Sequence, residues 1–143
     1  MEKIGLVTIT FNSEDVIHGF LHSALNQSFQ NFIIYIIDNH SQDETESIIK
    51  SYDDNRIVFI KNQKNLGVAK ANNQGIKLAI KENCSQVLII NNDVEFEEKL
   101  IEKMLVVQNQ KDCSLVAPKM MYFQTPTYIW YAGSSFIKKK GYL

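Results

Sequence analysis

The sequence predicts an α/β fold with a mainly parallel sheet flanked by helices and a short mixed-sheet extension at the C-terminus. Two observations lead to this prediction. Short apolar runs rich in β-branched residues alternate with segments of helical spacing. The apolar runs are also nearly continuous, which is typical of strands buried on both faces. With 143 residues, 45% of them hydrophobic, the chain can bury one sizeable core, so we expect a single domain over residues 1–143.

Each expected element has its own local signal. The apolar runs that predict strands lie at residues 4–11, 32–37, 57–60, 87–90 and 115–117. Apolar residues three and four apart predict helices at residues 16–25, 45–52 and 100–105. Ser41-Gln42-Asp43-Glu44 fits a capping box ahead of the second of these helices. After Pro118, apolar runs at 120–123 and 128–131 flank a Thr-Pro turn and predict a hairpin.

Charge and composition exclude several classes of partner. Lys plus Arg number 15 against 16 Asp plus Glu, and a formal charge of -1 gives no field that draws a nucleic acid to the surface. Cys84 and Cys113 lack metal-ligand spacing and suit a reducing compartment. We find no signal peptide and no apolar stretch long enough to span a bilayer. A cytoplasmic location is therefore expected. We expect the basic run Lys138, Lys139 and Lys140 to be a solvated segment, with peripheral contact to the inner face of the membrane as the alternative.

Polar residues follow four of the predicted strands, at residues 10–12, 38–41, 62–67 and 91–93. In a parallel sheet these strand ends meet at one edge, where ligands bind. Helix capping explains any one cluster, because Asp, Asn and Ser also begin helices. It does not require a carboxylate after both the second and the fourth strand, at Asp38 and Asp93. A nucleoside diphosphate sugar, with polar groups spread along its length, is a ligand that fits such an edge.

The four clusters lie within longer segments that resemble the signatures of inverting glycosyltransferase family 2. The segments occur in the family's order and near its spacing, and the third is similar to that of rhamnosyltransferase-like members. They are Val7-Thr8-Ile9-Thr10-Phe11-Asn12, Ile37-Asp38-Asn39-His40-Ser41-Gln42-Asp43, Asn65-Leu66-Gly67-Val68-Ala69 with Asn73-Gln74-Gly75, and Leu88-Ile89-Ile90-Asn91-Asn92-Asp93-Val94.

This resemblance implies a fold and an activity. The fold is the Rossmann-like GT-A type. The activity is transfer of a sugar from a UDP- or dTDP-linked donor to an acceptor hydroxyl with inversion, in polysaccharide or glycan synthesis. The acceptor would be a glycan or a lipid-linked molecule. No nucleic acid is expected as a partner.

The resemblance also implies a set of donor-binding residues. Asp38 would accept a hydrogen bond from an N–H of the base. Gly67 would adopt a positive φ or let the backbone approach the ligand, and the helix beginning near Val68 would point its N-terminus at the diphosphate. The expected contacts to the nucleotide sugar are Thr10, Phe11, Asn12, Asp38, Asn39, Ser41, Asn65, Gly67, Asn73 and Asn92.

Asp93 is the expected ligand of a divalent metal, Mg²⁺ or Mn²⁺. Family members usually carry two acids in an Asp-x-Asp arrangement, and this chain has Asn91 in the first place. One carboxylate can suffice, because substrate phosphates and water complete the coordination of these ions. The alternative is that Asp93 caps a helix ahead of Glu97 and Glu98.

No catalytic base is expected within the chain. The base of family 2 enzymes lies well beyond the Asp-x-Asp position, and residues 113–143 contain no Asp or Glu. We therefore expect the chain to be part of a longer enzyme, with a naturally short protein as the alternative. A non-catalytic module that binds a nucleotide sugar also stays open.

Three other α/β classes lack their motifs. A dinucleotide-binding oxidoreductase needs Gly-x-Gly-x-x-Gly after its first strand, where this chain has Thr10-Phe11-Asn12-Ser13. A P-loop nucleotidase needs Gly-Lys-Ser/Thr, which is not present. A signalling receiver domain has a pair of acids after its first strand, and this chain has none there.

Overall fold

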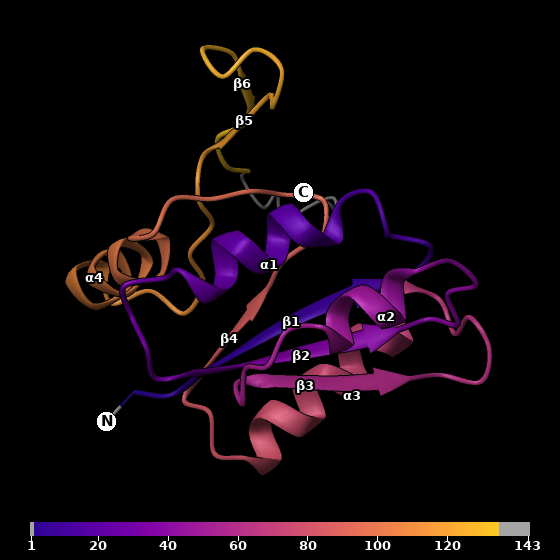
Figure 1. The fold of residues 1–143 in the computed structure, drawn as a ribbon. Helices are drawn as coiled ribbons and strands as arrows, with labels where there is room; N and C mark the ends of the chain where they lie inside the picture. The colour runs from indigo at the N-terminus through magenta and orange to yellow at the C-terminus, as the bar shows by residue number, and fades with distance from the viewer. Residues whose placement is uncertain (1, 135–143) are drawn as a thin grey trace, which may run out of the picture. The chain divides into compact units, whose positions relative to one another are not determined.

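The computed structural model describes residues 2–134, which form two compact units that divide after Glu98. The first unit contains a four-stranded sheet and three helices (Figure 1). Its elements in chain order are β1 (Ile4–Thr10), α1 (Ile17–Leu25), β2 (Phe32–Asp38), α2 (Thr45–Lys50), β3 (Ile57–Lys61), α3 (Val68–Lys81) and β4 (Gln86–Ile89).

The four strands are parallel and lie in the order β3-β2-β1-β4. β1 is central, and its first residue, Ile4, pairs with Phe32 of β2 and with Gln86 of β4. In Figure 1, α1 and α2 lie on one face of this sheet and α3 lies on the other. The predicted mainly parallel α/β architecture is confirmed.

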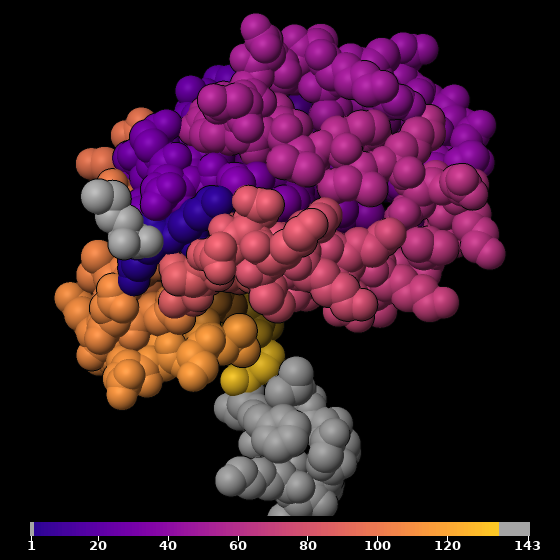
Figure 2. Space-filling model, turned by 90° about the horizontal axis from the view of Figure 1, so that it is seen from below, coloured from indigo at the N-terminus to yellow at the C-terminus, as the bar shows by residue number. Residues whose placement is uncertain are grey.

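The two inner strands, β1 and β2, are buried on both faces, as their continuous apolar runs predict, whereas β3 and β4 are only partly buried. On the α1 side, Leu6, Ile34 and Ile36 alternate with residues of the opposite face and are fully buried. On the α3 side, the core contains Val7, Tyr35 and Ile37 together with helix residues Ala71 and Ala79. Figure 2 views the molecule from this side, where the side chains of α3 and neighbouring loops lie over the sheet.

Small residues let α3 pack close to the sheet. Gly75 is buried in the middle of the helix, where glycine costs about 1 kcal/mol relative to alanine. A Cβ at this position would collide with the side chain of Val7. The close packing of α3 on β1 therefore accounts for the glycine.

The second unit contains α4 (Leu100–Lys111) and the antiparallel pair β5 (Met120–Met121) and β6 (Ile129–Tyr131). The predicted hairpin is confirmed. The predicted strand at 115–117 is wrong, because these residues have no strand partner and Leu115 is 88% exposed. The basic run Lys138 to Lys140, for which membrane contact was the alternative to a solvated segment, lies outside the described residues. None of the helices within residues 2–134 is long and apolar enough to cross a membrane.

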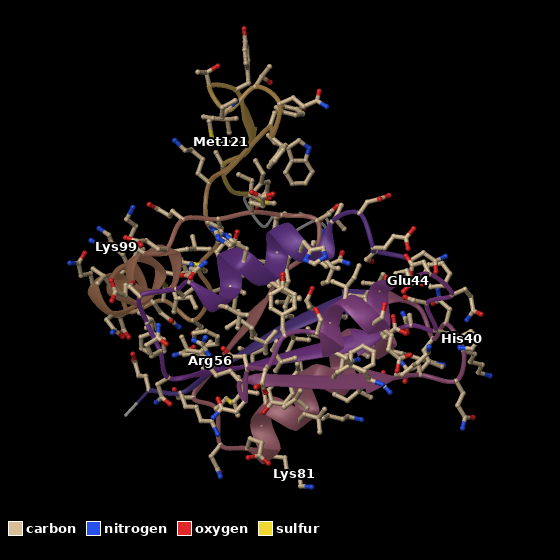
Figure 3. The ribbon with its side chains drawn as sticks, viewed as in Figure 1. His40, Glu44, Arg56, Lys81, Lys99 and Met121 are labelled. Atoms are coloured by element: carbon tan, nitrogen blue, oxygen red, sulfur yellow. The ribbon has the colours of Figure 1, made fainter. Side chains whose placement is uncertain are left out.

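Labelled residues mark the two ends of the first unit's sheet in Figure 3. At the amino ends of the strands, Arg56 pairs with Asp54 over 2.7 Å just ahead of β3. His40 and Glu44 mark the opposite edge, in the loop that follows β2. The polar segments identified in the sequence all follow carboxyl ends of strands, so they gather at this second edge.

Candidate functional site

A pocket lies at the carboxyl ends of β1 and β4, where the chain connections run in opposite directions. From β1 the chain passes through α1 to β2 on one side, whereas β4 joins the other side after α3. Such a switch point leaves a crevice between neighbouring strand ends in an open parallel sheet. The cavity has a volume of about 460 Å³.

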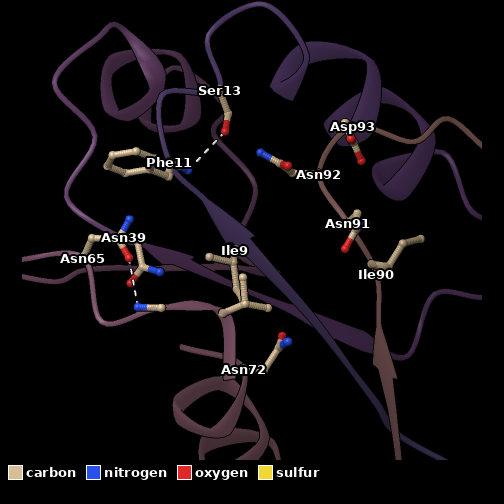
Figure 4. A pocket seen from close by; sticks show the side chains of 12 residues that line it. Ile9, Phe11, Ser13, Asn39, Asn65, Asn72, Ile90, Asn91, Asn92 and Asp93 are labelled. Atoms are coloured by element: carbon tan, nitrogen blue, oxygen red, sulfur yellow. Dashed lines mark hydrogen bonds between the residues drawn. The ribbon is translucent and has the colours of Figure 1, made fainter. Parts of the chain in front are cut away.

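The pocket is lined by the end of β1, by the segments that follow all four strands and by the start of α3 (Figure 4). In this view Asn39 and Asn65 lie together on one wall, and Asn92 and Asp93 lie opposite. All of the lining residues belong to the first unit. They are Ile9, Phe11, Ser13, Asn39, Asn65, Gly67, Val68, Asn72, Ile90, Asn91, Asn92 and Asp93.

The structure brings together some of the residues predicted from the sequence and leaves others outside the lining. Those that line the pocket are Phe11, Asn39, Asn65, Gly67, Asn92 and Asp93. Those outside it are Thr10, Asn12, Asp38, Ser41 and Asn73. Each of the five has a position in the fold that explains its absence from the pocket.

Asp38 is fully buried and its carboxylate is already engaged. Thr10 Oγ1 donates to Asp38 Oδ1 over 2.8 Å, and the hydroxyl of Ser41 donates to the same oxygen. The backbone N–H of Ser41 donates to Asp38 Oδ2 over 3.0 Å. A base could reach Asp38 only if these bonds opened. The next residue, Asn39, occupies the pocket wall instead.

Asn12 and Ser41 link the loop after β1 to the loop after β2. The backbone N–H of Asn12 donates to Ser41 Oγ over 2.9 Å, and Gln42 N–H donates to Asn12 Oδ1 over 2.9 Å. Asn12 has a φ of 50°, in the left-handed region that Asn tolerates better than most residues. Both side chains are thus used within the protein.

The predicted capping box does not form, because its residues join these two loops. The helix α2 begins at Thr45, whose N–H donates to Asp43 Oδ1 over 3.1 Å, and Thr45 Oγ1 accepts from the backbone N–H of Ser13 over 2.8 Å. Glu14 N–H donates to Asp43 Oδ2 over 3.1 Å, and Glu44 N–H donates to Glu14 Oε2 over 2.9 Å. We call this set of bonds between residues 12–14 and 41–45 the loop clasp.

Gly67 shapes the entry to α3. It has a φ of 79° and a ψ of 160°, so the predicted positive φ is confirmed. A side chain would be strained in this conformation, which is open to glycine. Asn65 Oδ1 accepts from the Gly67 N–H over 2.9 Å and fixes the turn. The first turn of α3 then begins at Val68, on the pocket wall, with its free backbone N–H groups at the helix N-terminus.

Asp93 is the one carboxylate in the lining, and it takes part in none of the ion pairs between described residues. Beside it, Asn92 Nδ2 is buried without a hydrogen-bond partner within residues 2–134. A buried amide donor left unpaired costs about 1–3 kcal/mol. A ligand acceptor at this position would remove that cost.

Three polar residues of the lining, Ser13, Asn72 and Asn91, were not among the expected contacts to the nucleotide sugar. Helical phase distinguishes Asn72 from Asn73. Ala71, Gly75 and Ala79 face the sheet, and at 100° per residue Asn73 falls on the opposite side of α3, where it is exposed. Asn72 flanks the sheet-facing side and reaches the pocket.

The comparisons with known proteins agree with this geometry. The sequence pattern of Glycosyl transferase family 2 matches residues 6–142. The chain belongs to this family. The match covers both units of the structure.

Curated glycosyltransferases are similar to this chain. Over 79 residues it is 38% identical to the UDP-Glc:alpha-D-GlcNAc-diphosphoundecaprenol beta-1,3-glucosyltransferase WfaP of Escherichia coli, covering 55% of this chain and 32% of WfaP. Over 124 residues it is 29% identical to the poly(ribitol-phosphate) beta-N-acetylglucosaminyltransferase TarP of Staphylococcus aureus, covering 83% of this chain and 37% of TarP. The chain thus spans about a third of the length of these relatives.

Solved structures show the same fold. TarS 1-349 of S. aureus in complex with UDP-GlcNAc superposes with a TM-score of 0.67 at 21% identity, over 85% of this chain and 38% of the TarS 1-349 chain. The mannosyltransferase PcManGT of Pyrobaculum calidifontis, solved with GDP-Man and Mn²⁺, superposes with a TM-score of 0.57 at 17% identity, over 66% of this chain and 28% of that one. The expected GT-A fold of family 2 is confirmed.

Proposed function

We propose that the pocket binds the nucleoside diphosphate part of a UDP- or dTDP-linked sugar, and that the chain takes part in inverting transfer of this sugar to an acceptor hydroxyl of a glycan or lipid-linked molecule. WfaP and TarP, by their names, transfer sugars to an undecaprenol-linked and a polymeric acceptor. TarS binds UDP and UDP-GlcNAc. Polysaccharide synthesis is the setting that these relatives support.

One observation carries the proposal: the N-terminus of α3 and the carboxylate of Asp93 face the same pocket. Free backbone N–H groups at a helix N-terminus attract anions, whereas a lone carboxylate repels them unless a cation lies between. A diphosphate together with a divalent cation satisfies both groups. A neutral ligand would neither bind the helix N-terminus as an anion nor bring a cation to Asp93.

The residues present fit a Mg²⁺ or Mn²⁺ ion held jointly with the ligand. Asp93 offers a carboxylate outside the described ion pairs, and Asn91 and Asn92, which also carry side-chain oxygens, line the same pocket. No group of three His, Cys, Asp or Glu able to hold a metal occurs within the described part of the chain. The ion would therefore depend on the diphosphate for most of its ligands. Bound there, it would neutralise negative charge on the leaving diphosphate.

The chain's own residues would bind and orient the donor. The first turn of α3 would hold the diphosphate, where charge develops as the sugar leaves. Phe11, half exposed at the end of β1, offers an apolar surface to the base. The proton of the acceptor hydroxyl needs a general base, and we place this base outside residues 1–143, because residues 113–143 have no carboxylate.

Calorimetric titration with UDP and dTDP, with and without Mn²⁺, tests this proposal. Wild type should bind at least one of them, and more tightly with Mn²⁺. Asp93→Asn keeps the size of the side chain and an oxygen that can cap a helix, but it loses the charge that attracts the metal. The variant should keep its thermal stability and lose the part of the affinity that depends on Mn²⁺.

Glu98→Gln is the matched control, because it removes an exposed carboxylate that does not line the pocket. It should retain the metal dependence of wild type. Wild-type chain that binds neither nucleotide would contradict the proposed donor site. Mn²⁺ dependence that persists in Asp93→Asn would exclude Asp93 as the metal ligand.

A further inference from the structure

Three side-chain amides form a connected network behind one wall of the pocket. Asn39 follows β2, Asn62 follows β3, and Gln74 lies on α3. Gln74 Nε2 donates to Asn62 Oδ1 over 2.9 Å, and Asn62 Nδ2 donates to Gln74 Oε1 over 3.0 Å. Asn62 Nδ2 also donates to Asn39 Oδ1 over 3.1 Å. The buried side chains of Asn39 and Asn62 are thereby held in place.

The backbone N–H of Leu66 decides which way this network points. A chain of amides could reverse, with every oxygen and nitrogen exchanged, because each amide has a donor end and an acceptor end. Leu66 N–H also approaches Asn39 Oδ1, at 3.4 Å, and a backbone N–H can only donate. Reversal would set this N–H against an NH₂ group. The oxygen of Asn39 therefore faces the network.

The NH₂ group of Asn39 remains for a ligand. Asn39 is 2% exposed and lines the pocket. No hydrogen bond joins Asn39 Nδ2 to another described residue. The atom is also absent from the fully buried polar atoms without a partner, so it retains contact with solvent. This wall of the pocket thus presents a hydrogen-bond donor.

We propose that Asn62 and Gln74 are positioning residues, which orient Asn39 so that its NH₂ group donates into the pocket. The pocket would then select a base that has a hydrogen-bond acceptor, such as a ring carbonyl, at this point. This inference rests on the proposed function. A carboxylate in place of Asn39 could only accept, and it would select an N–H edge such as N3–H of uracil or thymine. Asn39 would donate a hydrogen bond to the base, whereas Asp38 was expected to accept one. The orientation of Asn39 is set by Asn62 and Gln74, which do not contact the ligand.

Analogues of UDP that alter one polar group at a time measure this polarity. Sulfur accepts hydrogen bonds more weakly than oxygen does, so 2-thio-UDP or 4-thio-UDP should bind wild type roughly 3- to 10-fold more weakly than UDP. N3-methyl-UDP lacks the N–H but keeps both carbonyls, and its affinity should stay within about twofold of UDP. Calorimetry on the full chain gives all four dissociation constants.

Two variants separate the donor from the residues that position it. Asn39→Asp should reverse the pattern, with N3-methyl-UDP becoming the weak analogue. Gln74→Met keeps the volume of the side chain but loses both hydrogen bonds with Asn62, so the preference for oxygen over sulfur should fall below about twofold while UDP still binds. A role in folding alone would weaken all four ligands equally and leave their ratios unchanged.

Lys77→Met is the control, because it changes an exposed residue on the same helix and should keep the wild-type ratios. Wild type that is sensitive to N3-methylation, or that binds all four ligands equally, would overturn the inference while leaving the proposed function in place. So would Gln74→Met with unchanged ratios. Absence of UDP binding would remove the proposed function and this inference with it.

Discussion

Asp38 and Asn39 are adjacent in the chain, yet the first has a structural position and the second faces the pocket. Asp38 lies in phase with Ile34 and Ile36 on the α1 face of the sheet and is fully buried. Asn39 reaches the pocket. The resemblance to family signatures directed attention to the carboxylate, whereas strand periodicity alone indicates that Asp38 continues a buried face.

The structure changes what we expect from substitution of Asp38. In Asp38→Asn, an NH₂ group replaces one of two oxygens that accept from Thr10 and Ser41, and buried donors lose their acceptor. The free energy of unfolding should fall by about 1–3 kcal/mol. Urea denaturation measures it, with the exposed Asp53→Asn as control. Unchanged stability with weaker nucleotide binding would return Asp38 to direct contact with the base.

At the scale of elements, the loop clasp joins the segments that follow β1 and β2. Its bonds connect residues about 30 positions apart, so no local pattern in the sequence predicts them. The strands and helices were predictable because apolar periodicity is local. The clasp uses Ser, Asp and Glu residues that resemble a capping box, which is why the box was expected.

The clasp should make stability depend on acidic pH through Asp43. Burial acts to raise the pKa of the Asp43 carboxyl, but hydrogen bonds from Thr45 and from the backbone N–H of Glu14 outweigh it and hold this pKa below its ordinary value of 3.8. A carboxyl whose pKa is lower in the folded state stabilises the protein above its ordinary pKa. That contribution disappears as the pH falls through the lower, folded value.

Asp43→Asn should therefore be less stable than wild type at pH 7, by about 1 kcal/mol, because the charge that accepts these bonds is gone. The difference should shrink as the pH falls below about 4. Thermal unfolding at several pH values measures it, and Asp15→Asn, which changes an exposed acid in the loop after β1, is the control. A difference that is constant down to pH 2 would show that the charge of Asp43 does not stabilise the clasp.

At the scale of the whole molecule, the described residues separate into two units, and every lining residue belongs to the first. A polypeptide of residues 1–98 should therefore unfold cooperatively and bind UDP within about threefold of the full chain, since it keeps the whole sheet and pocket. Circular dichroism and calorimetry measure both properties. Loss of binding by a folded 1–98 polypeptide would show that the second unit contributes to the site. The single domain expected from length stays a prediction.

The amide-rich lining of the pocket has a consequence for how the protein responds to pH. Asn39, Asn65, Asn72, Asn91 and Asn92 carry no charge at any pH that the fold withstands. A sugar donor esterified at its terminal phosphate has no proton to lose near neutrality, whereas the nucleoside diphosphate released by transfer ends in a phosphate that ionises near pH 6. Affinity for the donor should thus be level across neutral pH while affinity for the spent nucleotide rises. Product inhibition would then grow as the surroundings become more alkaline.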